Sequence, residues 1–387
     1  MCLKQAGHAK SIHPATAALF HNMYLPRSLL TERIRIMDGF LVKRPGFLTT
    51  VQDKGRFGYQ WSGLSPAGAM DLHSMRLANL LVGNDMDEAA LEITIIGPTL
   101  EFHANAVIAI TGADLSPVLD GVSLPTYQAV PVRSGAILSF GARRCGCRCY
   151  LAVAGGLDIP LILGSRSTLL RNSVGGVNAE GRMLKTGDQI GFRSPPHFLK
   201  NIELRHIAPE PIDSNTAVLR VIPGPQEYCF TEKGIGTFFK SSYTVTDLCN
   251  RQGYRLEGAA IEHSGNGNIV SDGIAMGAIQ VPPNGQPIIM MSERQSTGGY
   301  PKIGTVITCD LPRVAQCFSG SHLYFTPTSI EEAQSLLREE MLFFLRLQEK
   351  FARSFVRIFT ATIEGHSYRA AVTPIAHEGS SEYVRRS

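Results

Sequence analysis

Several common catalytic and binding signatures are missing from this sequence of 387 residues. It contains no G-x-x-x-x-G-K-[ST] segment and no H-E-x-x-H segment, which excludes a P-loop and a zincin-type metal site. No apolar run reaches the roughly 18 residues that a membrane-spanning helix needs. The formal net charge is +4, which is too mild for a dedicated nucleic-acid-binding protein. We therefore expect no membrane and no nucleic acid among its partners.

The eight cysteines lack the paired C-x-x-C spacing of a zinc site. Cys145, Cys147 and Cys149 alternate, so on a strand their side chains would share one face and pack there as small residues. No secretion signal is recognisable. We therefore expect reduced thiols, no metal and a cytoplasmic protein.

The composition favours a β-rich protein. Hydrophobic residues make up 44% of the chain and charged residues 18%, which suits large buried cores. The 38 glycines and 22 prolines are spread without a period, so they punctuate many short elements. Short apolar runs, such as 106–111 and 288–291, lie between these turn residues. We predict a mainly β fold with a few helices.

One local pattern occurs three times, as SGAILSF (134–140), TGDQIGF (186–192) and SGSHLYF (319–325). Each has a small hydroxyl residue, a glycine and then a strand that reaches a phenylalanine. The glycine suits a tight turn with positive φ, and the phenylalanine suits a core. The pattern predicts related β units.

Two helices are predicted. Ser65-Pro66 suits an N-cap and first helical position, and this makes Ser65 a better cap than a nucleophile in GLSPAG (63–68). Gly83 suits the end of that helix. Ser329 and Glu332 form a capping box ahead of a second helix that runs to about residue 355.

Polar side chains gather in three glycine-rich segments: 51–71, 250–258 and 278–305. The first contains Gln52 and Arg56, and the second contains Arg251 and Arg255. The third contains the following polar residues: Gln280, Gln286, Arg294, Gln295, Thr297 and Lys302. Arginine binds carboxylates bidentately and glutamine both donates and accepts, so together these segments predict a pocket for a small amide or carboxylate.

The same segments carry a resemblance to a known family. TVQDKGRFGYQWSGLSPAGAMD, LEITIIGPTLEF, LAVAGGLDIPLILGSRST, NRQGYRLEG, GAIQVPPNGQPIIMMSERQSTGGYP and DLPRVAQ follow in order between about residues 40 and 335. They resemble the family of the 5-oxoprolinase C subunit, also called allophanate hydrolase subunit 2-like, which is similar to part of the carboxyltransferase domain of urea amidolyase. The sequence departs from the family pattern at Gln252, where we expect methionine, and at Asp272, where we expect glutamate. It also departs at Ser292-Glu293, where we expect Ala-Asp or similar, and at Ser296, where we expect threonine. These departures leave the substrate open.

The resemblance implies two cyclophilin-like β-barrel units. We accordingly expect the following division: an N-terminal extension (1–36), a first unit (37–195), a linker (196–216), a second unit (217–328), a C-terminal helix and following segment (329–368), and a tail (369–387). The acid-free stretch 1–31 suits a weak transit peptide or an extension ahead of a start near Met37.

The resemblance also implies a function. Family members work with a smaller B subunit, as a tight heteromer, and with an A subunit in the ATP-dependent hydrolysis of 5-oxoproline to L-glutamate. We expect these two partners to bind the ATP. One alternative is a carboxyltransferase that uses carboxybiotin on urea or a similar amide. A second is a non-catalytic subunit that sequesters an inhibitor of a histidine kinase.

The predicted substrate contacts come mainly from ERQSTGGYP (293–301). No residue is an obvious general base, so the catalytic residues stay unassigned and the base is expected from the B subunit. The predicted substrate-binding residues are Arg294, Gln295, Thr297, Gly298, Gly299 and Tyr300, with Gln52, Arg56 and Arg251 as further candidates.

Overall fold

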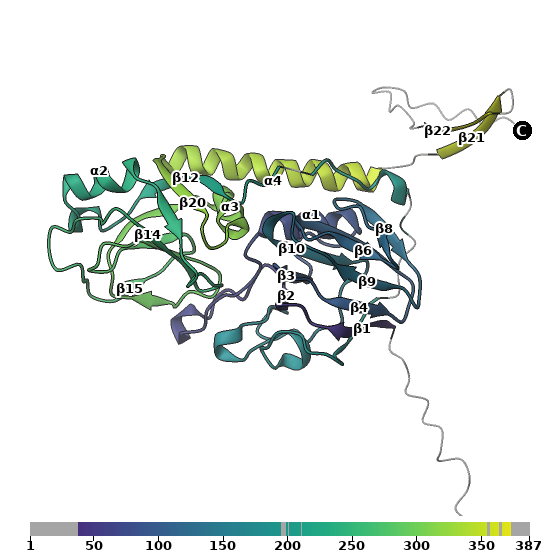
Figure 1. Ribbon diagram of the computed structural model, residues 1–387, viewed down its shortest axis with the longest axis horizontal. Helices are drawn as coiled ribbons and strands as arrows, with labels where there is room; N and C mark the ends of the chain where they lie inside the picture. The colour runs from purple at the N-terminus through teal and green to yellow at the C-terminus, as the bar shows by residue number, and fades with distance from the viewer. Residues whose placement is uncertain are drawn as a thin grey trace, which may run out of the picture. The chain divides into compact units, whose positions relative to one another are not determined.

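The computed structural model describes residues 38–194, 199, 201–209, 211–353, 357–363 and 366–372 (Figure 1). The predicted N-terminal extension and tail fall outside these residues, apart from 369–372. The described residues are mainly β with four α-helices, which confirms the predicted fold class. The helices are α1 (Leu72–Leu81), α2 (Glu232–Lys240), α3 (Leu311–Gln316) and α4 (Ile330–Arg353). Short 3-10 helices include η2 (Gln60–Ser62) and η7 (Thr308–Asp310).

The first β unit consists of two sheets. The six-stranded sheet has the order β11 (Gln189–Gly191), β1 (Gly39–Arg44), β4 (Thr99–Phe102), β9 (Ile137–Phe140), β6 (Pro117–Leu119) and β7 (Val122–Ser123). The five-stranded sheet has the order β2 (Leu48–Gln52), β3 (Ala90–Thr94), β10 (Cys145–Val153), β5 (Ala106–Asp114) and β8 (Ala129–Val132).

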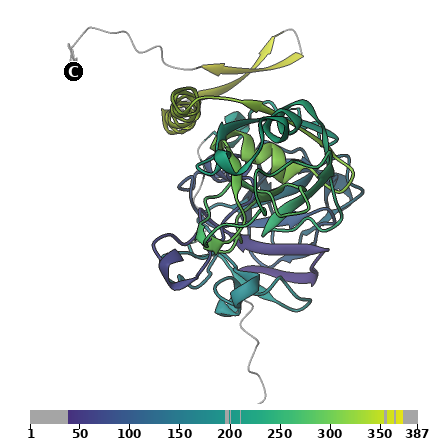
Figure 2. The ribbon, with the colours of Figure 1, turned by 90° about the vertical axis from the view of Figure 1, so that its left-hand side faces the viewer.

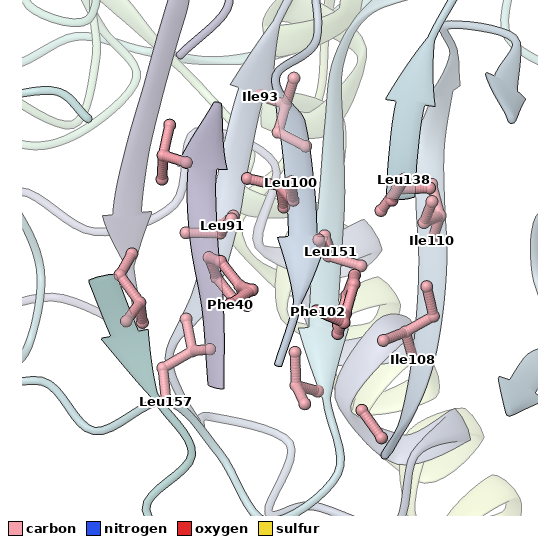
Figure 3. Close-up of a cluster of buried hydrophobic side chains, with 14 of the residues drawn as sticks. Phe40, Leu91, Ile93, Leu100, Phe102, Ile108, Ile110, Leu138, Leu151 and Leu157 are labelled. Atoms are coloured by element: carbon pink, nitrogen blue, oxygen red, sulfur yellow. The ribbon is translucent and has the colours of Figure 1, made fainter. Parts of the chain in front are cut away.

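The five-stranded sheet is buried on both faces, as β10 shows. Cys149 and Leu151 belong to the core in which the side chains of Figure 3 lie, together with Phe40 and Phe102 from the other sheet. Tyr150 and Ala152 point the other way and pack with side chains of α1 and α4. This explains the unbroken apolar run YLAVAGG, because a strand covered on both faces does not alternate. A register shift lies between Cys145 and Cys149, so the expected simple alternation of the cysteines is interrupted.

The second β unit is a closed barrel of seven strands. Their order is β12 (Thr216–Pro223), β19 (Lys302–Val306), β16 (Ala278–Gln280), β17 (Ile288–Met290), β14 (Gly253–Gly258), β13 (Tyr243–Val245) and β20 (His322–Pro327). The parallel pairing of β12 with β20 closes it, and Figure 2 looks toward this unit. Two short pairs lie outside these sheets: β15 (Asp272–Gly273) with β18 (Thr297–Gly298), and β21 (Arg357–Ile363) with β22 (His366–Val372).

The repeated glycine pattern predicts the backbone correctly. Gly135, Gly187 and Gly320 have φ values of 89°, 90° and 92°. They precede β9, β11 and β20, and Phe325 of β20 is buried in the core of the barrel. The first two copies lie in the first β unit and the third lies in the second, so one turn chemistry serves both units.

The predicted start of the first helix is wrong. Helix α1 begins at Leu72, and the side chain of Asp71 caps it by accepting a 2.9 Å hydrogen bond from the Ser74 backbone. Ser65 instead donates its hydroxyl to the Arg294 carbonyl at 2.6 Å. Pro66 after Ser65 favours a helix start, but the Ser65 hydroxyl binds the second β unit instead of capping the helix. Gly83 follows the last turn with φ of 75°, as predicted.

Helix α4 starts as predicted, with Ser329 accepting a 3.1 Å hydrogen bond from the Glu332 backbone. It lies alongside both β units (Figure 1). Glu340 on α4 accepts from His73 of α1 at 2.8 Å and from the Cys309 thiol of η7 at 3.3 Å. The helix is therefore fixed to both halves of the structure. Burial, with the Glu340 charge beside it, raises the pKa of Cys309 to about 12, so this thiol stays protonated.

The two β units meet around a buried ion network. Arg251 of the second unit bonds Glu92 of β3, donates to Glu293 at 2.7 Å and donates to the Gly68 carbonyl at 2.7 Å. Glu92 also accepts from the Tyr150 hydroxyl at 2.7 Å. All of these charged side chains are at least nine-tenths buried. Each charge thus has opposite charge and hydrogen bonds around it, which a buried ion requires.

A second set of bonds joins the same two units. Gln316 of α3 accepts from the backbone of Cys147 and Arg148 at 2.9 and 3.1 Å, and donates to Asp71 at 2.7 Å. Arg148 of β10 donates to the Tyr254 hydroxyl of the barrel at 2.6 Å. The units are therefore locked by polar groups that neither unit could satisfy alone.

Glu92 makes this junction sensitive to acid. Burial opposes ionisation of its carboxyl, but the charges of Arg251 and Arg148 outweigh that effect and lower its pKa below the ordinary 4.5. For a carboxyl whose folded pKa is lowered, the stabilisation is fully present above the unfolded pKa and is lost as the pH falls through the folded pKa. The junction is therefore strongest above about pH 4.5.

We predict that Glu92→Gln lowers the free energy of unfolding by about 3–5 kcal/mol, because it leaves Arg251 without one of its buried counter-charges. Urea denaturation at neutral pH measures this change. Glu101→Gln is the matched control, since it removes an exposed pair with Lys43 (3.0 Å) and should leave the free energy of unfolding nearly unchanged. Equal effects of the two substitutions would contradict the role given to Glu92.

Candidate functional site

A pocket of about 350 Å³ opens on the second β unit. Its walls come from β14, β16 and β17 and from the segments that precede β14 and follow β17. This volume lies in the range of small-molecule sites. The lining residues are Leu248, Asn250, Gln252, Gly253, Arg255, Gln280, Pro282, Asn284, Ile288, Met290, Gln295 and Tyr300.

Three glutamine side chains run along one wall of the pocket. Gln252 donates to the Gln295 amide oxygen at 2.8 Å, and Gln295 donates to the Gln280 amide oxygen at 3.5 Å. Gln280 in turn donates to the Tyr300 carbonyl at 3.3 Å. The amides orient one another, so they present fixed donors and acceptors to a ligand.

The segment 293–301 is held in place by its backbone. Glu293 donates its N–H to the Arg251 carbonyl at 2.8 Å, and Thr297–Gly298 pairs with Asp272–Gly273 as β18 with β15. A Cβ added at Gly298 would lie 2.7 Å from the Gln280 amide nitrogen. Glycine at this position therefore allows the segment to press against the pocket glutamines.

The pocket is polar and carries one charge. Arg255 of β14 is the single charged residue among its lining residues, and its side chain is exposed. The lining contains amides and a tyrosine but neither a carboxylate nor an imidazole. Such a site can bind and orient an amide that bears a carboxylate, and it supplies no general base of its own.

The residues predicted from ERQSTGGYP divide into three groups. Gln295 and Tyr300 line the pocket. Thr297, Gly298 and Gly299 form and follow β18 behind it, without lining it. Arg294 turns away: it donates to the carbonyls of Ile274 at 2.9 Å and Met291 at 3.3 Å, and burial lowers its pKa to about 10.

Gln52 and Arg56 lie in the first β unit and do not line the pocket. Both are fully buried. Gln52 donates to the Thr168 carbonyl at 3.0 Å, and Arg56 donates to the carbonyls of Ile162 at 3.1 Å and Ser167 at 2.9 Å. They hold the loop around 162–168 against the end of β2.

Arg251 belongs to the junction between the units and not to the amide pocket. With Glu293 it lines a larger cavity of about 790 Å³ between the two units. The two cavities share Asn250 and Gln252, which form the wall between them. The second and third predicted glycine-rich clusters thus meet at the pocket. The first contacts both of them at the junction, through Gly68 and Ser65, but does not line the pocket.

The predicted substrate-binding residues did not include Gln252, Gln280 or Arg255. Gln280 and Arg255 were visible as members of the polar clusters, but nothing in the sequence separates strand side chains that face a pocket from those that face a core. Gln252 was visible as one of the departures from the family pattern. That departure is the feature that could have identified the amide wall.

The described part of the chain offers neither a metal cluster nor a spanning helix. It contains no group of three or more His, Cys, Asp or Glu side chains that could hold a metal ion. None of the helices in the described ranges is long and apolar enough to cross a membrane.

The chain is similar to known proteins over most of its length. Residues 62–327 match the carboxyltransferase domain, subdomain A and B. The chain is 38% identical to the C subunit of 5-oxoprolinase from Escherichia coli (strain K12) over 305 residues, which cover 79% of this chain and 96% of that protein. It is 33% identical to urea amidolyase of Saccharomyces cerevisiae, covering 87% of this chain but 19% of that protein.

The fold is shared with a solved structure. The Kluyveromyces lactis urea carboxylase matches with a TM-score of 0.75 and 32% identity, over 81% of this chain and 30% of that one. This chain thus corresponds to one part of the urea enzymes and to nearly the whole of the bacterial protein. With the domain matched over residues 62–327 and the Escherichia coli protein covered almost end to end, this protein belongs to the carboxyltransferase domain family, subdomain A and B, as a relative of the 5-oxoprolinase C subunit.

Proposed function

We propose that this chain is the C subunit of an ATP-dependent 5-oxoprolinase, a cytoplasmic hydrolase in which it works with the A and B subunits to convert 5-oxo-L-proline to L-glutamate. The observation that carries the proposal is the 38% identity to the C subunit of the Escherichia coli enzyme over 96% of its length. A match this full supports the same assembly, with a tightly bound B subunit.

The chemistry of the pocket supports this substrate. 5-Oxoproline is a cyclic amide with a carboxylate. Arg255 offers a cation for the carboxylate, and Gln252 and Gln295 offer donors and acceptors for the ring amide. In this proposal Thr297, Gly298 and Gly299 position the wall to which Gln295 and Tyr300 belong.

The hydrolytic step needs groups that this pocket does not offer. Its lining residues include no side chain suited to activating water, so we assign the general base to the B subunit. ATP does not fit it either, because a triphosphate needs several cations or a backbone cradle and the lining provides one arginine. We therefore place ATP binding on the two partners, and the binding of the amide substrate on this chain.

A second function is favoured by the match to urea carboxylase at a TM-score of 0.75. In that case the chain is a carboxyltransferase component that uses carboxybiotin on urea or a similar amide. The sequence has no Met-Lys-Met attachment segment, so the biotin would be carried by a separate protein. A biotinylated partner that co-purifies and is detected with streptavidin distinguishes this function from the first.

We predict that the full chain, co-expressed with the A and B subunits, releases glutamate from 5-oxoproline only when ATP is present. Release is measured by a coupled glutamate assay. The control is the complex of the two partners without this chain, which should be inactive. A complete and folded complex that gives no glutamate would sink the 5-oxoprolinase proposal.

Within that complex, Arg255→Ala should raise KM for 5-oxoproline about 10- to 100-fold, because a hydrogen bond to a charged group contributes about 1.5–3 kcal/mol. Gln295→Ala should raise it about five- to tenfold, as a neutral hydrogen bond contributes about 1 kcal/mol. Glu257→Ala is the matched control, since it is exposed on the same strand as Arg255 and does not line the pocket. An unchanged KM in both pocket variants assigns the substrate to another cavity.

Arg294→Ala tests whether this arginine contacts substrate or supports the fold. Its bonds to the Ile274 and Met291 carbonyls favour support, because their loss leaves buried acceptors unsatisfied. We predict a decrease of about 1–3 kcal/mol in the free energy of unfolding, measured with urea, and an unchanged KM in the complex that remains folded. The reverse result, with normal stability and a raised KM, would restore Arg294 as a substrate contact.

A further inference from the structure

Helix α4 is held to the rest of the structure by one face. Phe344, Leu347 and Phe351 are buried against side chains of α1 and β10, and Glu340 bonds His73. In Figure 2 the yellow-green helix is seen end-on, with one side facing the strands. Its orientation about its own axis is therefore fixed, and so is the set of residues that it exposes.

The exposed side of α4 carries large apolar residues. Leu337, Met341, Leu342 and Leu345 are 41%, 39%, 48% and 43% exposed, and Ile330 is 55% exposed. Side chains three to four positions apart lie next to one another on a helix, so Leu337, Met341 and Leu345 form a continuous patch, whereas Leu342 lies about 100° farther around the helix than Met341. Contiguous apolar patches of this kind mark interaction surfaces.

The patch is part of a row of uncharged exposed residues along the helix, here called the seam. The order of its residue types is nearly the same in both directions. At 100° per residue, seven exposed residues fall within about 40° of Met341 around the helix. In order they are Ile330, Gln334, Leu337, Met341, Leu345, Gln348 and Ala352. Leu337 and Leu345 lie four positions on either side of Met341, and Gln334 and Gln348 lie seven positions on either side. The seam is thus nearly palindromic in chemistry.

A palindromic seam is self-complementary when two copies run antiparallel. A two-fold axis at Met341 brings Leu337 of one copy beside Leu345 of the other, and Gln334 beside Gln348. Such isologous contacts use the same patch on both copies. We infer that α4 is the contact through which two copies of this chain form an antiparallel dimer, with Met341 at the two-fold axis.

The helix dipoles agree with the antiparallel direction. Two antiparallel helices set the N-terminal end of each dipole beside the C-terminal end of the other, whereas parallel helices would place like ends together.

The first experiment compares oligomeric states of the full chain by analytical ultracentrifugation. Wild type is expected to dimerise, and Met341→Glu to weaken the dimer at least 100-fold, because the two new carboxylates meet at the axis. Val270→Glu is the matched control: it charges an apolar side chain that is 92% exposed on the second β unit, and should leave the dimer intact. Circular dichroism checks that all three proteins fold alike.

The second experiment tests the direction of pairing by oxidative cross-linking. In the Met341→Cys variant, the new cysteines of the two copies should cross-link to each other. Gln334→Cys alone should not, but a mixture of Gln334→Cys with Gln348→Cys should, with wild type as the control for the native thiols. A wild type that stays monomeric, a dimer that survives Met341→Glu, or cross-linking of Gln334→Cys alone each overturns the inference. If wild type is monomeric and Met341→Glu no longer binds the B subunit, the inference is overturned in favour of a heteromeric contact.

Discussion

The pairing of Arg251 with Glu92 and Glu293 is the constraint on which the arrangement of the two β units depends. All three charged side chains are buried, and burial of a charge is unfavourable unless an opposite charge compensates it. Glu92 compensates Arg251 from across the junction, and Glu293 does so from within the same unit. Arg251 and Glu293 also flank the segments that carry Gln252 and Gln295. The ion network that joins the units therefore sets the spacing of the amide wall, and the stability of the junction and the geometry of the pocket have a common origin.

The amide pocket shows a division of labour within one short segment. Glu293, Arg294 and Gln295 follow one another, yet the first binds Arg251, the second binds backbone carbonyls, and the third faces the pocket. Glu293 thus holds Arg251 at the junction, Arg294 stabilises the surrounding backbone, and Gln295 is available to a ligand. The lining residues include neither an acid nor a base that titrates near neutrality, which is why the proposed function gives this chain the binding of the amide and a partner the general base.

The sequence predicted the β-rich fold, the capped start of α4 and the positive φ of Gly135, Gly187 and Gly320, since each depends on local backbone chemistry. The candidate site was predicted less well. Gln295 and Tyr300 do line the pocket, but Arg251, Arg56 and Arg294 are enclosed by carbonyls or carboxylates. Whether an arginine is available to a ligand depends on residues far away along the chain, such as Glu92 for Arg251. The same reason explains Ser65, whose hydroxyl serves Arg294 and not α1.

The parallel pair of β12 and β20 has a consequence for the order in which the chain can fold. Thr216 pairs with His322 and Val221 with Pro327, so the barrel closes with nearly all of its chain lying between the two strands. Closing a loop of this length lowers the entropy of the chain before the contacts between β12 and β20 stabilise it, and such topologies fold slowly. On the ribosome, the first β unit can complete its sheets while the barrel still lacks its closing strand. The barrel, once closed, then binds to the first unit through Gly68, Asp71 and Glu92.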